Sequence, residues 1–276
     1  MNRLIKFSLL TIFLGYAIVF PCDAIAEKRT ALVCGNSSYL YSSPIKNPVN
    51  DARAISEALD KLGFNVIRGT DLTKLEMDRQ IAAFAKRLKD ADIAIFFYAG
   101  HGLQLNMKNY LVPIDFNPNS NAYLITMLVS MDTILSKLEK EKRVSIIFLD
   151  ACRDNPLANK LTANMGRGRS LLFDENRGVS VIRQGLAEVE GKAGTLIAYA
   201  TQPGNIALDG TGRNSPFTEA LLKYINIPGL EVRDMLTKVR VRVIKKTREK
   251  QIPWDHSSLV EEIYLKKKKK RFAPPP

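Results

Sequence analysis

A run from Val144 to Leu149, apolar except for Ser145, is the feature that most constrains the fold of this chain. A run of this length with β-branched residues and no polar alternation is typical of a strand buried on both faces of a sheet. The run ends at Asp150-Ala-Cys152, and Asn155-Pro156 then prevents further regular pairing. Cys152 is therefore predicted just past the carboxyl end of a central strand, where open α/β sheets bind their ligands.

A second buried-strand run matches the first one. It extends from Asp92 to Tyr98 and ends in Ala99-Gly-His-Gly102, so His101 is also predicted past the carboxyl end of a strand. The separation of about 50 residues between His101 and Cys152 leaves room for one crossover helix, which allows the two strands to be parallel neighbours. A thiol and an imidazole on adjacent strand ends form a nucleophile–base pair.

The rest of the chain alternates strand and helix signals. Strands are predicted at 30–34, 64–68, 194–200 and 258–264, a hairpin piece at 109–114, and helices at 47–62, 73–89, 131–140, from 215 onward and at 232–247. Thr73 and Glu76 form a capping box that opens the second helix, and Ser215 caps the fourth helix with Pro216 at its first position. Such alternation predicts an α/β fold with a mainly parallel, doubly wound sheet.

Both ends of the chain carry basic signals. Arg3 and Lys6 precede an apolar run that ends before Ala24-Ile-Ala26, which predicts a secretory signal peptide at 1–26 and a periplasmic or secreted protein. An uncleaved membrane anchor is the alternative. At the other end, the segment 266–276 is a Lys-rich, proline-ended tail in a chain of net charge +13. The tail is either a solvated end or a contact to an anionic surface.

Removal of residues 1–26 leaves Cys34 and Cys152 as the cysteines. Two cysteines in an exported chain could form a disulfide. Cys34 lies within the apolar run Ala31–Cys34, so a buried, inert thiol is the expectation. A disulfide would also block the predicted nucleophile.

Three segments carry a resemblance to a known family: Tyr98-Ala-Gly-His-Gly102, Asn109-Tyr-Leu-Val-Pro-Ile-Asp115 and Asp150-Ala-Cys-Arg-Asp-Asn-Pro156. They resemble the caspase-like cysteine peptidases, most closely the bacterial metacaspase-like branch, the orthocaspases, over about 29–264. The resemblance implies a caspase-like three-layer sandwich, with a mainly parallel central sheet and helices on both faces. It also implies a large part at about 27–156, a linker at about 157–192 and a small part at about 193–265. In this family the linker is often the place where the chain is processed.

The family resemblance assigns roles to the two strand ends. Cys152 is the expected nucleophile and His101 the expected base, and the backbone N–H groups of Gly102 and Cys152 are the expected donors to the oxyanion. His256, in Trp254-Asp-His-Ser257, lacks a strand-end context and is interpreted as a surface or packing histidine.

Substrate choice is predicted from carboxylates. Asp51 and Asp150 lie at the same predicted sheet edge in a basic protein, which suggests a pocket for a cation; the alternative is that they merely cap a helix and end a strand. Metacaspases carry acids at the matching places and cleave after Arg or Lys, whereas caspases hold an Asp with arginines. Asp209 is predicted to border the pocket. Ala99 departs from the serine that several metacaspases carry there.

The sequence thus predicts an exported cysteine endopeptidase that acts on proteins or peptides with Arg or Lys at the cleavage position. No oxygen-ligand loop of recognisable spacing is present, so no metal or other cofactor is expected, and calcium dependence stays open. Two alternatives are a catalytically inactive, peptide-binding homologue and a flavodoxin-like nucleotide binder. The absence of a phosphate loop argues against the second alternative.

Overall fold

The computed structural model of the 276-residue chain describes residues 27–105, 108–120, 124–139, 143–152, 182–184, 186, 191–202, 205 and 207–268. In chain order, the principal elements are β1 (Arg29–Gly35), α1 (Pro48–Lys61), β2 (Asn65–Thr70), α2 (Lys74–Arg87), β3 (Ile93–Leu105), β4 (Lys108–Leu111), β5 (Val129–Ser130), α3 (Met131–Leu138), β6 (Val144–Cys152), β7 (Ile182–Gln184), β8 (Thr195–Tyr199), α5 (Pro216–Tyr224), α6 (Val232–Thr247) and β9 (Trp254–Ser257). The predicted signal peptide, most of the predicted linker and the end of the tail lie outside the described residues.

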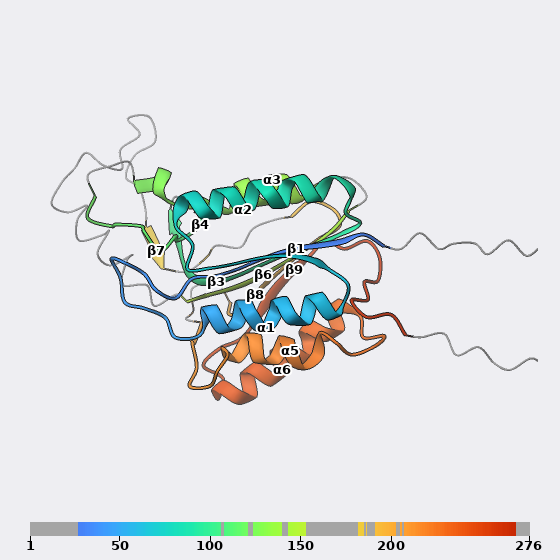
Figure 1. Ribbon diagram of the computed structural model, residues 1–276. Helices are drawn as coiled ribbons and strands as arrows, with labels where there is room; N and C mark the ends of the chain where they lie inside the picture. Colours follow the sequence, from blue (N-terminus) through green and yellow to red (C-terminus); the bar gives the residue numbers. More distant parts are fainter. Residues whose placement is uncertain are drawn as a thin grey trace, which may run out of the picture.

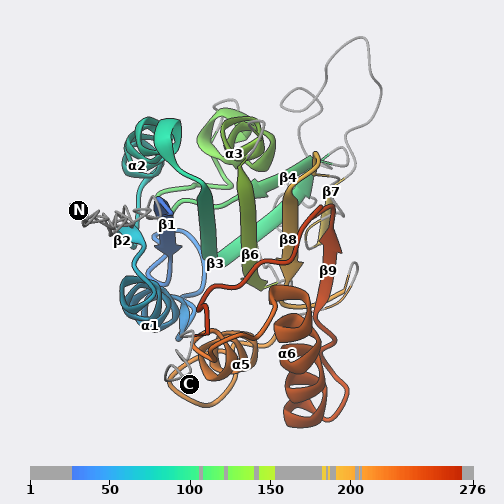
Figure 2. The ribbon, with the colours of Figure 1, turned by 90° about the vertical axis from the view of Figure 1, so that its right-hand side faces the viewer.

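A central sheet divides the molecule into three layers. Its strands follow the order β2-β1-β3-β6-β8-β9, in which β9 alone pairs antiparallel to its neighbour and the others pair parallel. Helices α2 and α3 cover one face, and α1, α5 and α6 cover the other (Figures 1 and 2). The predicted three-layer α/β sandwich with a mainly parallel sheet is therefore confirmed.

The alternation of side chains along β3 and β6 builds two separate cores. Residues of odd number in β3, such as Ile95 and Phe97, pack with α1, α5 and α6, whereas Phe96 and Tyr98 pack with α2 and α3. Because both faces are covered, β3 from Ile93 to Tyr98 and β6 from Ile146 to Leu149 are apolar, as the sequence predicts. Asp150 follows Phe148 at a spacing of two residues, which puts this carboxylate on the α1 and α5 face of β6.

The strand that carries His101 is longer than the sequence predicts. β3 does not end at Tyr98 but continues to Leu105, where it pairs antiparallel with β4 and β7 outside the central sheet. Gly100 permits this continuation because its φ is +152°, and a Cβ there would lie 2.7 Å from the hydroxyls of both Tyr39 and Tyr98. The prediction that His101 lies beyond a strand end is therefore wrong; the residue lies within β3.

Several local predictions are confirmed. Thr73 and Glu76 form the predicted reciprocal capping box at the start of α2, and Ser215 caps α5 with Pro216 in its first turn. β4 pairs antiparallel with β3, as expected of the hairpin piece at 109–114. Cys34 is free and buried, as expected of an inert thiol.

Two other predictions are wrong. The closing strand is β9, Trp254–Ser257, and not 258–264, where Tyr264 makes only an isolated bridge to Glu231. The sequence does not reveal β9 because an edge strand of polar residues has no apolar run. His256 therefore lies within a strand. Within the predicted irregular linker, Ile182–Gln184 forms β7. The division into large part, linker and small part stays a prediction.

No helix among the described residues has both the length and the apolar character that crossing a bilayer would require.

Candidate active site

The backbones of His101 and Cys152 lie side by side. β3 and β6 are parallel neighbours, and their register makes the Cα atoms of His101 and Cys152 direct partners at the last residue of β6. Adjacent strands of a sheet are roughly 4.8 Å apart, so this register brings the two backbones together. The sequence predicted the parallel pairing and the proximity, although it placed both residues after strand ends.

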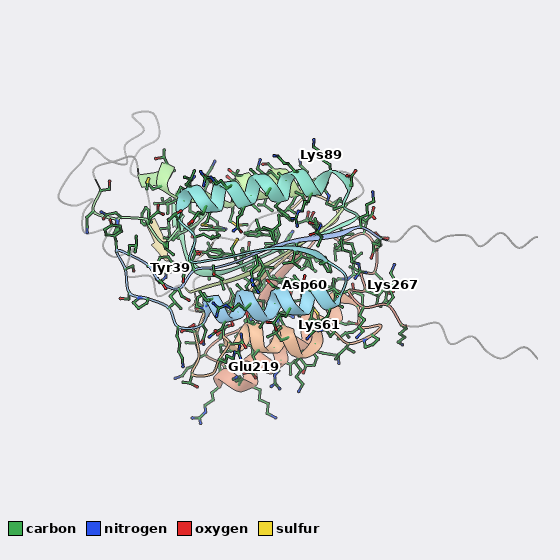
Figure 3. All side chains as sticks on the ribbon, in the orientation of Figure 1. Tyr39, Asp60, Lys61, Lys89, Glu219 and Lys267 are labelled. Carbon is green, nitrogen blue, oxygen red and sulfur yellow. The ribbon has the colours of Figure 1, made fainter. Side chains whose placement is uncertain are left out.

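Two tyrosines hold the backbone of His101, one through its N–H and one through its carbonyl. The Tyr39 hydroxyl accepts a hydrogen bond from the His101 backbone N–H at 2.7 Å, and the Tyr98 hydroxyl donates to the His101 carbonyl at 2.8 Å. The ring centroids of Tyr39 and His101 are 4.4 Å apart. Figure 3 shows Tyr39 at the end of the sheet where the parallel strands finish. Neither role is visible in the sequence, because Tyr39 lies in a turn-rich loop and Tyr98 lies in an apolar strand run.

The imidazole of His101 is buried and neutral at neutral pH. Burial lowers its pKa from 6.5 to about 4. Its Nε2 lies 3.4 Å from the carbonyl oxygen of Ser43, which can only accept, so this contact favours the tautomer with a proton on Nε2. Nδ1 then carries the lone pair, and it has no hydrogen-bond partner among the described residues. In this tautomer, the lone pair of Nδ1 is available to accept a proton.

Gly102 is tightly enclosed by protein. A Cβ at this position would lie 3.0 Å from Cδ2 of Leu186 and 3.2 Å from Cβ of Ala151. The absence of a side chain at Gly102 thus allows close packing against Ala151 of β6 and against Leu186. The predicted donation by Gly102 and Cys152 N–H groups to an oxyanion stays a prediction.

The three acids that the sequence singled out gather around the start of α5. Asp51 on α1 accepts hydrogen bonds from Asn214 Nδ2 (2.8 Å) and Ser215 N (3.1 Å). Asp150 on β6 accepts from the hydroxyls of Ser215 and Thr218, the latter at 2.9 Å. Asp51 and Asp150 therefore bind the start of α5, in addition to their places in α1 and β6.

Asp209 closes the group from the loop that precedes α5. Its carboxylate accepts hydrogen bonds from the backbone N–H groups of Lys46 (3.0 Å) and Asn47 (3.1 Å). It lies close enough to raise the pKa values of both other acids. Sequence reasoning found the three acids but not Asn214 and Thr218, and it found Ser215 only as a helix cap.

The electrostatic state of this group is dominated by burial. Burial, followed by the nearby charge of Asp150, raises the pKa of Asp51 from 3.8 to about 8. Burial also raises the pKa of Asp150 to about 6, with a further contribution from Asp209, while its bonds to Ser215 and Thr218 oppose the rise. Burial raises the pKa of Asp209 as well. Carboxylates that resist ionising together gain strongly from a cation placed among them.

Within the part of the chain that the structure describes, no three His, Cys, Asp or Glu side chains are grouped as ligands for a metal ion.

Comparisons with known proteins agree with this arrangement. Residues 28–264 match the model of the caspase domain family. The chain is 31% identical over 130 residues to the mouse mucosa-associated lymphoid tissue lymphoma translocation protein 1 homolog, which covers 47% of this chain and 15% of that protein. It is 22% identical over 259 residues to mouse caspase-1, covering 90% of this chain and 62% of that protein.

A solved structure shares the fold. The crystal structure of caspase-1 from Spodoptera frugiperda superposes with a TM-score of 0.62 at 19% identity, covering 89% of this chain and 93% of that one. The chain spans only 15% of the mouse lymphoma translocation protein homolog and 62% of mouse caspase-1. Because the caspase domain model matches nearly all of the described chain, from residue 28 to residue 264, this protein belongs to the caspase domain family.

Proposed function

We propose that this protein is a cysteine endopeptidase that cleaves peptide bonds after Arg or Lys. The observation that carries the proposal is the group of Asp51, Asp150 and Asp209 in the elements that adjoin the His101–Cys152 pair. Membership of the caspase domain family supports the peptidase chemistry. The substrate preference rests on the acids.

The reaction follows from the state of His101. The Cys152 thiol gives its proton to Nδ1 of His101, and the thiolate attacks the scissile carbonyl carbon. Backbone N–H groups of Gly102 and Cys152 stabilise the resulting oxyanion. His101 then protonates the leaving amine, which leaves a thioester that water hydrolyses. Cys34 is not a competing nucleophile, because burial raises the pKa of its thiol to about 12.

The acids favour a basic side chain at the cleavage position for an electrostatic reason. Arg keeps its charge in a desolvated pocket, and its planar guanidinium can reach two carboxylates at once. Burial raises both pKa values most, and nearby carboxylates raise them further: Asp150 and Asp209 in the case of Asp51, and Asp209 in the case of Asp150. A cation between Asp51 and Asp150 would offset this concentration of negative charge. An acidic side chain would add a further negative charge, so cleavage after Asp is disfavoured.

A panel of fluorogenic peptides that differ only in Arg, Lys or Asp at the cleavage position tests the proposal. Turnover after Arg and Lys, none after Asp, and none in Cys152→Ala is the expected result. Equal turnover of the Asp peptide would refute the preference. A folded wild type that cleaves no peptide, and whose Cys152 does not react with an Arg-based electrophilic inhibitor, would instead support the inactive, peptide-binding alternative.

Self-processing in the linker is the second part of the proposal. Lys160, Arg167, Arg169 and Arg177 offer basic cleavage positions in the predicted linker. The end of that linker returns to the site, because β7 pairs antiparallel with β3 at Leu103–Leu105, next to His101. Cuts before β7 would leave β7 paired with β3, and β8 paired with β6 and β9.

The proposal that the protein is exported rests on the pattern of residues 1–26 alone.

A further inference from the structure

The start of α5 is built around two carboxylates. Ser215 contacts both of them, because its backbone N–H donates to Asp51 and its hydroxyl donates to Asp150. The same hydroxyl accepts from Thr218 N at 2.9 Å, which is the N-cap bond of the helix. Forming α5 therefore fixes the Ser215 hydroxyl at Asp150.

Each carboxylate is held through one oxygen. Asn214 and Ser215 both donate to Oδ1 of Asp51, and its Oδ2 accepts no hydrogen bond from the described residues. The hydroxyls of Ser215 and Thr218 both donate to Oδ2 of Asp150, which leaves Oδ1 without a side-chain donor among the described residues. One oxygen of each acid is thus anchored, and the other is left for a ligand.

The donors around these acids are neutral. Within the described part of the chain, no Lys or Arg forms an ion pair with Asp51 or Asp150, although both acids are almost fully buried. Acids elsewhere on the same face differ: Glu219 pairs with Arg242 and Lys246, and Asp255 pairs with Arg240. Hydroxyl and amide donors stabilise a carboxylate without neutralising it, so its charge stays available for an incoming cation.

We propose that Ser215 and Thr218 are specificity-determining positioning residues, whose hydroxyls keep Asp150 ionised and oriented to receive the basic side chain of the substrate. This inference rests on the proposed function, because it takes the acids to be the substrate pocket. Neither hydroxyl is required to touch substrate. They act through Asp150, and so do not belong to the catalytic pair.

The arrangement makes cation binding depend on pH. Protonation of Asp150 removes the charge that attracts the substrate, and the two hydroxyl donors oppose that protonation. Among the described residues, Asp209 in the loop before α5 raises the pKa of both Asp51 and Asp150. Lys46 in the loop before α1 acts on Asp209 and lowers its pKa. Removing one hydroxyl at Thr218 should therefore make the pocket lose its charge at a higher pH.

Thr218→Val tests the proposal because it removes the hydroxyl and keeps the shape of this fully buried side chain. Thr218→Ser retains the hydroxyl and removes a methyl group. Thr237→Val, on the exposed face of α6, is the matched control, because that hydroxyl bonds only to the Arg233 carbonyl of its own helix. Each variant is assayed for kcat/KM on an Arg peptide across pH.

The acid midpoint of kcat/KM should move up by roughly one pH unit in Thr218→Val, while Thr218→Ser and Thr237→Val keep the wild-type midpoint. At a pH well above the midpoint, kcat should change less than KM. An unmoved midpoint in a folded Thr218→Val, or an equal shift in Thr218→Ser, would overturn the proposal, since the second result would indicate packing.

A second measurement separates this inference from the proposed function. Carbon-13 NMR of Asp carboxyls in Cys152→Ala protein reports the titration of Asp150 without any turnover; the signal is assigned with Asp150→Asn. A higher pKa of Asp150 in Thr218→Val, with Thr218→Ser unchanged, supports the positioning role even in a wild type that cleaves no Arg peptide. If Thr218→Val does not fold, Thr218→Ala is measured in its place. An unchanged pKa overturns the role even in an active, Arg-specific enzyme.

Discussion

The hydroxyl of Tyr39 accepts a hydrogen bond from the backbone N–H of His101 at 2.7 Å, while the two rings lie 4.4 Å apart. Tyr39 comes from the loop after β1, and His101 lies in β3. The contact therefore couples a surface loop to the predicted base. With the bond from Tyr98 to the His101 carbonyl, it fixes the two peptide groups on either side of the His101 Cα.

Tyr39→Phe removes the acceptor of this buried N–H and keeps the ring. Leaving the donor unpaired should cost about 1–3 kcal/mol in the free energy of unfolding, with a fall in kcat because the imidazole is less well held. Chemical denaturation and peptide kinetics measure the two effects. Tyr224→Phe, at the end of α5 and with no hydrogen bond from its hydroxyl to the described residues, is the control. Unchanged stability and kcat in Tyr39→Phe would show that the contact does not support the site.

Gly100→Ala should displace the two tyrosine hydroxyls that hold the backbone of His101. A Cβ at Gly100 would lie 2.7 Å from the hydroxyls of Tyr39 and Tyr98, and the φ of +152° is rarely adopted by other residues. We expect a loss of roughly 1–3 kcal/mol in stability, together with loss of peptidase activity. Gly212→Ala is the matched control, because its nearest contact would be an ordinary 3.6 Å. Full activity in a folded Gly100→Ala would contradict the conclusion that a glycine is required at position 100 of β3.

His101→Gln should remove catalysis and reduce the acid sensitivity of the fold. Loss of a general base typically lowers the rate by about 10²–10⁴-fold. Since the folded pKa of about 4 lies below the ordinary value of 6.5, the unfolded state binds more protons between these pH values, and stability falls as the pH falls through that window. Thermal unfolding from pH 7 to pH 4 should therefore decline less steeply in His101→Gln. An equal decline in wild type and variant would show that His101 is not buried in its neutral form.

Asp51→Asn should increase the stability of the fold and weaken cleavage after Arg. The folded pKa of about 8 exceeds the ordinary 3.8, so the folded state binds more protons between these values, and stability falls as the pH rises through that window. An amide removes this penalty and still accepts from Asn214 and Ser215, so the variant should be more stable at pH 7 by about 1 kcal/mol or more. Cleavage after Arg should weaken by about 2–5 kcal/mol in kcat/KM, and Asp150→Asn should weaken it similarly. Wild-type kinetics on Arg peptides in either variant would remove that acid from the pocket.

Incubation of wild type beside Cys152→Ala tests self-processing. New amino termini after Arg167, Arg169 or Arg177 should appear in wild type alone, because these arginines match the proposed preference for a basic residue at the cleavage position. The fragments should stay associated, since β8 is fully buried between β6 and β9. Equal nicking in both proteins would indicate a contaminating protease. An uncut, active wild type would show that processing is not needed.

Local sequence signals were sufficient for much of the fold. The apolar runs of β3 and β6 identified a sheet covered on both faces, because only such strands lack polar alternation. The capping box at Thr73 and the Ser215-Pro216 start of α5 were read correctly, since caps depend on neighbouring backbone groups alone. β9 escaped detection, because a short polar edge strand is defined by its partner β8 and not by its own residues.

The sequence by itself determined the α/β class, the parallel neighbours β3 and β6, and the chemically distinctive residues His101, Cys152, Asp51 and Asp150. These follow from hydrophobic pattern and residue type, which are local properties of the chain. Only the tertiary structure decided that Tyr39 and Tyr98 hold His101, and that Ser215 and Thr218 hold Asp150. The reason is physical: a hydroxyl has no fixed partner in the sequence, and its role depends on which buried donor or acceptor the packed elements bring within about 3 Å.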